Sequence, residues 1–231
     1  MADKIRLQKA LALLTGLSRR QAEKLVVAGK VKVNGKKAQI GQKVDLTKDK
    51  LELEGKPVSG LKELNYLIVY KPTGVITSRS DELGRKTIME LLPKKYQHLF
   101  PVGRLDYDSE GLVLLTNDGD LAYKLTHPKF EVEKVYQVKP DRKLSSAAFS
   151  HLKKGMCIGK HKVVPRTLKR LADGGIEITL TSGQKHVVRK LFKHAGYEVV
   201  VLKRVRLGLF ELGNLKPGQY QLVVNPYKNP A

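Results

Sequence analysis

The chain has 231 residues, and its contents of 41% hydrophobic and 6% aromatic residues are those of a protein with a packed core. Its apolar runs are too short to span a bilayer, its N-terminus is polar, and its one cysteine cannot form an internal disulfide, which together favour the cytoplasm and argue against a membrane. The 44 Lys and Arg against 22 Asp and Glu give a formal net charge of +22, so nucleic acid is the leading class of partner.

The first part of the chain predicts two short helices. Apolar residues in segment 7–14 recur at i, i+3, i+4 and i+7, which places them on one helical face, and Gly16 ends the pattern. Ser18 stands three residues before Gln21, the spacing of a capping box, and predicts a second helix as far as about Ala28.

A basic hairpin is expected to follow these helices. Residues 31–33 alternate as a strand, and Asn34-Gly35 is the typical pair of a type I′ turn. Basic residues avoid the apolar positions throughout, so the unit should have one positive face that contacts the phosphates of a nucleic acid. The residues that we expect to make these contacts are Arg19, Arg20, Lys24, Lys30, Lys32 and Lys36.

The stretch from Ile5 to about Asp45 resembles the RNA-binding module named after small-subunit ribosomal protein four, the S4 domain. The resemblance is carried by IRLQKAL, GLSRRQAEKLVVAGKVKVNG and a later KVD, in which caps, glycines and basic positions agree together. Residues 56–62 combine Pro, Gly and Ser with lysines and predict a linker. We therefore expect a small α/β RNA-binding domain at 1–60 and a larger domain at 61–231.

The larger domain is expected to be α+β with a largely antiparallel sheet, because it lacks the regular strand–helix alternation of a doubly wound fold. Turns are predicted at 71–74 and 117–119, and Asp120 is expected to cap the helix that follows the second turn. The predicted strands are 65–70, 112–116, 132–138, 176–181 and 197–205. The predicted helices are 87–92, 120–126, 145–154 and 184–195.

One segment gathers charged residues in a loop before an apolar strand, a common way to present catalytic groups. It contains Arg104, Asp106, Asp108 and Glu110, while Asp118 is expected to serve the turn with its following glycine. The residue types alone do not say which acid acts, and Asp108 or Glu110 can simply satisfy loop amides or lysines. A carboxylate pair also suits glycoside hydrolysis, but a cationic chain with no Trp and five Phe offers few sugar-stacking platforms.

The segment GRLDYDSEGLVLLTNDGDLAYKLTHP resembles the signature of the RsuA/RluB-like ribosomal RNA pseudouridine synthases over its whole length. YLIVYKPTGVITS, FPVGRLD, EVEKVYQV, LKRVRLG and LKPGQY also match, in family order. The resemblance implies a pseudouridine synthase catalytic domain that breaks the bond from uracil N1 to ribose, turns the base and rejoins it through C5. This reaction needs no external energy and no cofactor, but it requires the base to be flipped out of the RNA.

The resemblance also implies roles for individual residues. Asp106 is the expected catalytic carboxylate, acting on either the ribose or the base, and Arg104 is expected to hold the flipped-out conformation. Tyr136 is expected to stack on the uracil, although a plain core role on its strand remains open. Arg189 is expected to pair with Asp106 and keep it ionised, with Val188 as the apolar residue beside the base.

Some positions depart from the family pattern or have a neutral interpretation. Val187 stands where the family usually has Gln or Glu, and Ser182-Gly183-Gln184 stands where it has EGK or EGR, so a polar contact is missing there. His186 is expected to lie near RNA phosphate, and Cys157 to be a small residue packed in a core. Six scattered histidines and one cysteine predict no metal site.

Two functions remain open from the sequence. The first is site-specific isomerisation of uridine in ribosomal RNA by a monomeric enzyme, with the large subunit slightly favoured over the small. The alternative is a non-catalytic RNA-binding protein associated with the ribosome. Retention of Asp106, Arg104, Tyr136 and Arg189 together favours the enzyme.

Overall fold

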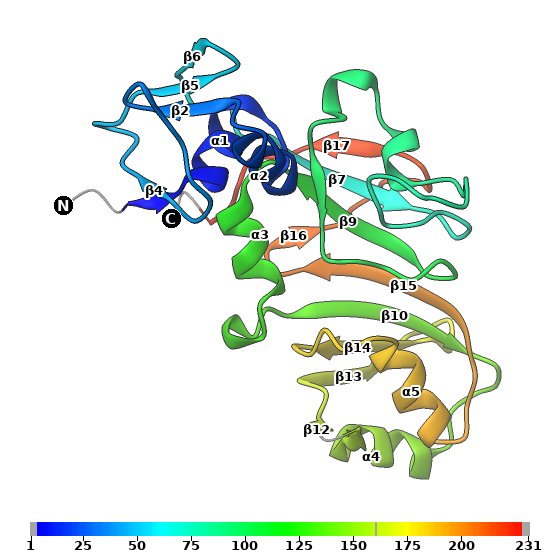
Figure 1. Ribbon diagram of the computed structural model, residues 1–231. Helices are drawn as coiled ribbons and strands as arrows, with labels where there is room; N and C mark the ends of the chain where they lie inside the picture. The colour runs from blue at the N-terminus through cyan, green and yellow to red at the C-terminus, as the bar shows by residue number, and fades with distance from the viewer. Residues whose placement is uncertain (1–3, 160, 228–231) are drawn as a thin grey trace. The chain divides into compact units, whose positions relative to one another are not determined.

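The computed structural model describes residues 4–159 and 161–227 and divides the chain into two compact units, Met1–Leu64 and Asn65–Ala231 (Figure 1). The predicted α+β class is confirmed. Among the named strands of the described residues, every pair is antiparallel except the pair of β9 (Glu110–Thr116) with β15 (Val199–Leu207). The predicted linker is wrong at its start, because β6 (Lys56–Val58) pairs with β5 (Leu51–Leu53). No helix in the described ranges is long and apolar enough to cross a membrane.

The first unit packs two helices against a small sheet. The capping box is confirmed, since the Ser18 hydroxyl accepts from the Gln21 N–H at 3.1 Å and the Gln21 side chain accepts from the Ser18 N–H at 2.9 Å. Positive φ angles at Asn34 (52°) and Gly35 (78°) confirm the type I′ turn. The other elements are β1 (Ile5–Arg6), α1 (Leu7–Thr15), α2 (Arg19–Val27), β2 (Val31–Val33), β3 (Lys36–Lys37) and β4 (Lys43–Val44).

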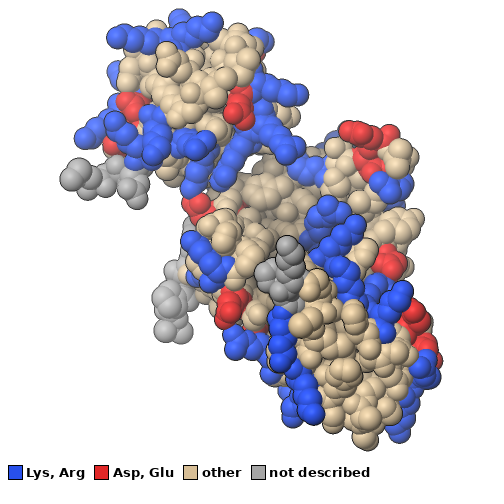
Figure 2. All heavy atoms as spheres, turned by 60° about the horizontal axis from the view of Figure 1, so that its bottom comes forward, with Lys and Arg blue, Asp and Glu red and all other residues tan. Residues whose placement is uncertain are grey.

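The amphipathic pattern of the first unit separates its core from its charges. The core is built from the apolar faces of α1 and α2 and from Val31 and Val33 of β2. All six predicted RNA-binding side chains are exposed, although Lys30 is ion-paired with Glu54 at 2.7 Å. On the face of the molecule drawn in Figure 2, Lys and Arg side chains predominate over Asp and Glu, in agreement with the net charge of +22 for the whole sequence.

The second unit is built on a nine-stranded sheet with the order β13-β14-β10-β15-β9-β7-β17, to which β16 and β8 add at β15 and β9. Helices α4 and α5 lie at the β13–β14 end, where Leu191 and Phe192 of α5 belong to the main core (Figure 1). The strands are β7 (Tyr66–Lys71), β8 (Phe100–Val102), β10 (Lys134–Pro140), β11 (Met156–Ile158), β12 (His161–Val163), β13 (Thr167–Arg170), β14 (Ile176–Leu180), β16 (Phe210–Glu211) and β17 (Tyr220–Leu222). The helices are α3 (Gly119–Thr126), α4 (Ser146–Lys154), α5 (Val187–His194) and the 3-10 turns Ile88–Leu91, Lys94–Tyr96 and Pro128–Phe130.

A glycine allows the parallel pairing of β9 with β15. Gly111 has φ +108°, and a Cβ there would lie 2.3 Å from the backbone oxygen of Arg204. Any other residue would therefore separate the two strands. Gly111 thus holds the charged loop that precedes β9 against the strand beside it.

Three expectations for the second unit are wrong in detail. Asp118, not Asp120, is the N-cap of α3, where its side chain accepts from the N–H groups of residues 120 and 121. The last helix begins at Val187, three residues later than predicted, and leaves residues 184–186 in a loop. Cys157 is exposed on the short strand β11 instead of being packed in a core.

Candidate active site

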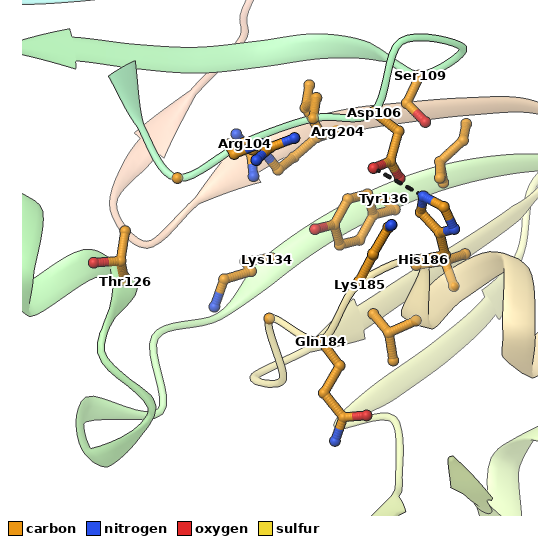
Figure 3. A pocket seen from close by; sticks show the side chains of 16 residues that line it. Arg104, Asp106, Ser109, Thr126, Lys134, Tyr136, Gln184, Lys185, His186 and Arg204 are labelled. Carbon is orange, nitrogen blue, oxygen red and sulfur yellow. Dashed lines mark ion pairs between the residues drawn. The ribbon is translucent and has the colours of Figure 1, made fainter. Parts of the chain in front are cut away.

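A cavity of about 440 Å³ lies in the second unit, between the loop before β9 and the loop before α5 (Figure 3). Strands β10 and β15 contribute the side chains of its wall, and the C-terminal end of α3 contributes Thr126. Its size is in the range of small-ligand sites. Of the predicted catalytic and substrate-binding residues, it brings together Arg104, Asp106, Tyr136 and Val188.

The loop that carries Asp106 is fixed by hydrogen bonds on both sides of this residue. The Thr77 hydroxyl donates to the Leu105 carbonyl at 2.9 Å and accepts from the Leu105 N–H at 3.2 Å. The Ser109 N–H donates to the Asp106 carbonyl at 3.1 Å. Because Leu105 and Ser109 are buried while the Asp106 side chain is 34% exposed, the loop holds its carboxylate towards the cavity.

The partner of the Asp106 carboxylate is His186, not Arg189 as predicted. His186 Nε2 lies 3.3 Å from Asp106 Oδ1, as the dashed line in Figure 3 marks. The Arg189 guanidinium instead pairs with Asp108 at 2.8 Å and donates to the backbone carbonyls of Asp108 and Val199. The late start of α5 explains this change of partner, because His186 remains outside the helix with a left-handed φ of 57°.

Tyr136 and Val188 form the apolar side of the cavity. Tyr136 lies on β10, opposite Ile178 of β14, and is 8% exposed, so it serves both the core and the cavity. Val188 and Val187, on the first turn of α5, are also buried and line the cavity. The departure from the family at Val187 thus extends an apolar surface, which suits a planar ring.

Two buried cations in the cavity wall had no role assigned from the sequence. Burial, together with the nearby charge of Arg204, lowers the pKa of Lys134 to about 8, and its ammonium donates to the carbonyls of Val132 and Thr181. Arg204 is 3% exposed and donates from Nε to the Leu112 carbonyl, while its Nη2 is buried without a hydrogen-bond partner. Buried donors without a partner are uncommon in folded proteins, which makes Arg204 a candidate to contact an oxygen atom of a ligand.

A third buried cation, Lys71, holds a turn that is bonded to the loop carrying Asp106. Its side chain is fully buried at the end of β7, and its ammonium donates to the carbonyls of Pro72 at 3.0 Å and Val75 at 2.8 Å. Burial lowers the pKa of Lys71 to about 8, against the opposing effect of Asp108, Asp106 and Glu110. The turn that Lys71 holds is bonded to the loop, since the Gly74 N–H donates to the Tyr107 carbonyl at 2.9 Å.

Comparisons with known proteins agree with this architecture. A family model described as RNA pseudouridylate synthase matches residues 65–194, and an S4 domain model matches residues 5–50. A protein of Bacillus subtilis (strain 168) named ribosomal large subunit pseudouridine synthase B is 39% identical over 220 residues, which are 92% of this chain and 89% of the relative. A protein of Aquifex aeolicus (strain VF5) named as an uncharacterized RNA pseudouridine synthase is 38% identical over 224 residues, covering 94% and 89%.

A solved structure shows the same relationship at the level of the fold. The crystal structure of a pseudouridylate synthase has 30% sequence identity and a TM-score of 0.69, and the match covers 95% of this chain and 96% of the other. Family models, relatives and fold therefore confirm the resemblance inferred from the sequence motifs. The chain belongs to the RNA pseudouridylate synthase family and is an RNA pseudouridine synthase of the RsuA/RluB-like type with an N-terminal S4 domain.

Proposed function

We propose that this enzyme isomerises a specific uridine of ribosomal RNA in the cytoplasm, as a monomer, with Asp106 as the catalytic carboxylate. The observation that carries the proposal is the cavity in which Asp106, Arg104 and Tyr136 meet. Large-subunit RNA is favoured over small-subunit RNA because the Bacillus subtilis relative, at 39% identity, is named a ribosomal large subunit pseudouridine synthase.

The reaction balances without a redox partner or an added group. The bond from N1 to C1′ breaks, the bond from C5 to C1′ forms, the C5 proton leaves to water, and N1 gains a proton. Asp106 provides the carboxylate that acts during this exchange of bonds, on either the ribose or the base. The imidazole of His186 lies 3.3 Å from one carboxylate oxygen of Asp106 and leaves the other oxygen for the substrate.

The remaining cavity residues fit a flipped-out nucleotide. The Tyr136 ring and the apolar pair Val187 and Val188 are positioned to enclose the uracil. Arg104 is exposed at the cavity, from where it can occupy the space that the base leaves in the RNA. The side chains of Lys134 and Arg204 place positive charge in the cavity wall, which complements the phosphates of that nucleotide.

Tritium release from ribosomal RNA labelled at uridine C5 tests the proposed target. Each pseudouridine formed releases one tritium to water, so the wild-type enzyme should release close to one equivalent per large-subunit RNA and far less from small-subunit RNA. Release from small-subunit RNA alone would overturn the assignment of the subunit. Release from neither, with transfer RNA as the active substrate, would overturn the ribosomal target.

The basic residues of the S4 domain should act on RNA affinity and not on the chemical step. If Arg19 and Arg20 bind phosphates, the Arg19→Ala/Arg20→Ala variant should bind RNA more weakly, and the slope of log affinity against log salt should shrink by roughly one for each phosphate that is no longer neutralised. The rate at saturating RNA should stay at the wild-type value, because the candidate active site lies in the other unit. Titrations at several salt concentrations measure both quantities.

If the slopes of log affinity against log salt were equal for the variant and the wild type, the two arginines would lie on a solvated helix face and would not contact phosphates. A matched control is Lys48→Ala, which removes an exposed cation outside the predicted set and should leave the slope nearly unchanged. A lower maximal rate with unchanged binding would mean that the S4 domain shapes the catalytic site instead.

A further inference from the structure

We propose that Tyr123, His127 and Phe130 form a stacking site for a base that neighbours the target uridine in the RNA. This inference rests on the RNA substrate of the enzyme but not on which ribosomal subunit supplies it. It concerns the segment at the end of α3 and the 3-10 turn Pro128–Phe130, outside the residues that line the cavity.

The three rings form one cluster at the surface. The ring centroids of Tyr123 and His127 are 4.7 Å apart, those of Tyr123 and Phe130 are 5.7 Å apart, and those of His127 and Phe130 are 6.3 Å apart. All three side chains are nevertheless exposed, Tyr123 to 47% and Phe130 to 39%. Aromatic side chains that pack together and remain open to solvent provide preformed faces for a further ring.

The cluster begins at the edge of the cavity. Thr126 lines the cavity and is the residue immediately before His127, and Figure 3 shows it at one end of the cavity, with Asp106 and His186 towards the other. The end of α3 is also close to the catalytic loop, since a Cβ at Gly103 would lie 3.6 Å from the Thr126 methyl group. An RNA strand that places one base in the cavity and leaves it at the Thr126 end passes this cluster.

The charges around the rings favour RNA as the occupant. The Lys129 ammonium lies 4.8 Å from the Phe130 centroid and 5.2 Å from that of Tyr123, and it is free to turn towards a phosphate. The adjacent carboxylate of Glu131 is neutralised by Arg166 at 2.7 Å. Exposed rings beside lysines are the usual platform for single-stranded bases, and Lys129 can hold the phosphate that joins two nucleotides.

The reaction itself gives a reason for a base-stacking site next to the cavity. Flipping one uridine out of a stack removes a stacking partner from each adjacent base, at a cost of a few kcal/mol. An aromatic platform one residue beyond the cavity edge replaces that stacking for one neighbour. The site thus contributes to affinity for the flipped-out conformation through a nucleotide that is not itself modified.

The absence of tryptophan from the sequence makes the test direct. In Phe130→Trp the single indole should be quenched when it stacks on a base, whereas Val200→Trp, at a position 61% exposed on β15, should not be quenched. The RNA probes are a single-stranded decamer with one uridine between adenosines and the same decamer with abasic sites at both adjacent positions. Quenching should occur with the first probe and disappear with the second.

Affinity gives the second readout. Tyr123→Leu/Phe130→Leu keeps apolar side chains, so it should bind the abasic decamer as the wild type does. It should bind the adenosine decamer roughly 5- to 150-fold more weakly, the range that stacking on aromatic side chains implies. If the leucine variant bound both decamers equally weakly, the three rings would have a purely structural role. If the indole of Phe130→Trp were not quenched and the leucine variant bound RNA as the wild type does, the surface would be left to a protein partner. Either result would overturn the proposal.

The two proposals fail separately. If ribosomal RNA releases no tritium while the indole of Phe130→Trp is quenched and the leucine variant discriminates the decamers, the target assignment fails and the stacking site stands. If tritium is released but the decamers are not discriminated, the stacking site fails alone.

Discussion

Asp106→Asn is expected to lower the turnover of uridine to pseudouridine by at least about 10³-fold, while RNA binding stays at or above the wild-type level. The amide keeps the shape of the side chain but removes the carboxylate to which we assign the chemistry. The cations that bind phosphate all remain, and one negative charge beside the RNA disappears, so affinity has no reason to fall. Single-turnover tritium release gives the rate, and a filter-binding titration gives the affinity.

Asp108→Asn is the matched control two residues away on the same loop. Its carboxylate is 60% exposed and pairs with Arg189, and exposed pairs contribute little. The Arg189 guanidinium also keeps its bond to the Asp108 backbone carbonyl at 3.1 Å. This variant should therefore retain most of its activity, and a variant series in which Asp108→Asn is dead and Asp106→Asn is active would reverse the assignment.

Lys71→Met should change the pH dependence of folding and slow the reaction. Because burial lowers the pKa of Lys71 to about 8 from 10.5, the unfolded chain binds more protons at this residue between these two values. The unfolding free energy of the wild type should therefore rise with pH across that window, relative to a variant without the lysine. From pH 7 to pH 9.5 the expected relative gain of the wild type is about 2 kcal/mol.

Denaturant unfolding of both proteins at the two pH values measures this difference. Lys139→Met, on the exposed side of β10, is the control. Its unfolding free energy should change with pH as that of the wild type does, because the ammonium of Lys139 stays in water when the chain folds. Lys71→Met should also reduce turnover about tenfold or more, because the carbonyls of Pro72 and Val75 lose their donor and the turn bonded to the loop that carries Asp106 loosens. If the difference in unfolding free energy between the wild type and Lys71→Met did not change with pH, Lys71 would not be desolvated in the folded protein.

The sequence predicts local features of this enzyme well. The capping box at Ser18 and the turn at Asn34-Gly35 are correct because their residues interact within three or four positions of one another. The motif residues Asp106, Arg104 and Tyr136, which the resemblance to the family singled out, line one cavity.

Long-range interactions account for what was missed. Lys71 and Arg204 look in sequence like solvated cations, and only the pairing of β7, β9 and β15 buries them. The partner of Asp106 was wrong because it depends on where α5 begins, and His186 adopts a left-handed φ that no local pattern predicts. Asp118 was assigned to a turn and Asp120 to the helix cap, an error of two positions that cap preferences alone do not resolve.

Mapping pseudouridine in ribosomal RNA, in cells with and without the gene, tests the central claim most directly. Loss of the gene should remove pseudouridine at one position or a few neighbouring positions of large-subunit RNA. A plasmid copy of the wild type should restore the modification, and the Asp106→Asn copy, expressed to the same level, should not. An unchanged pseudouridine profile without the gene, or restoration by the Asp106→Asn copy, would contradict it.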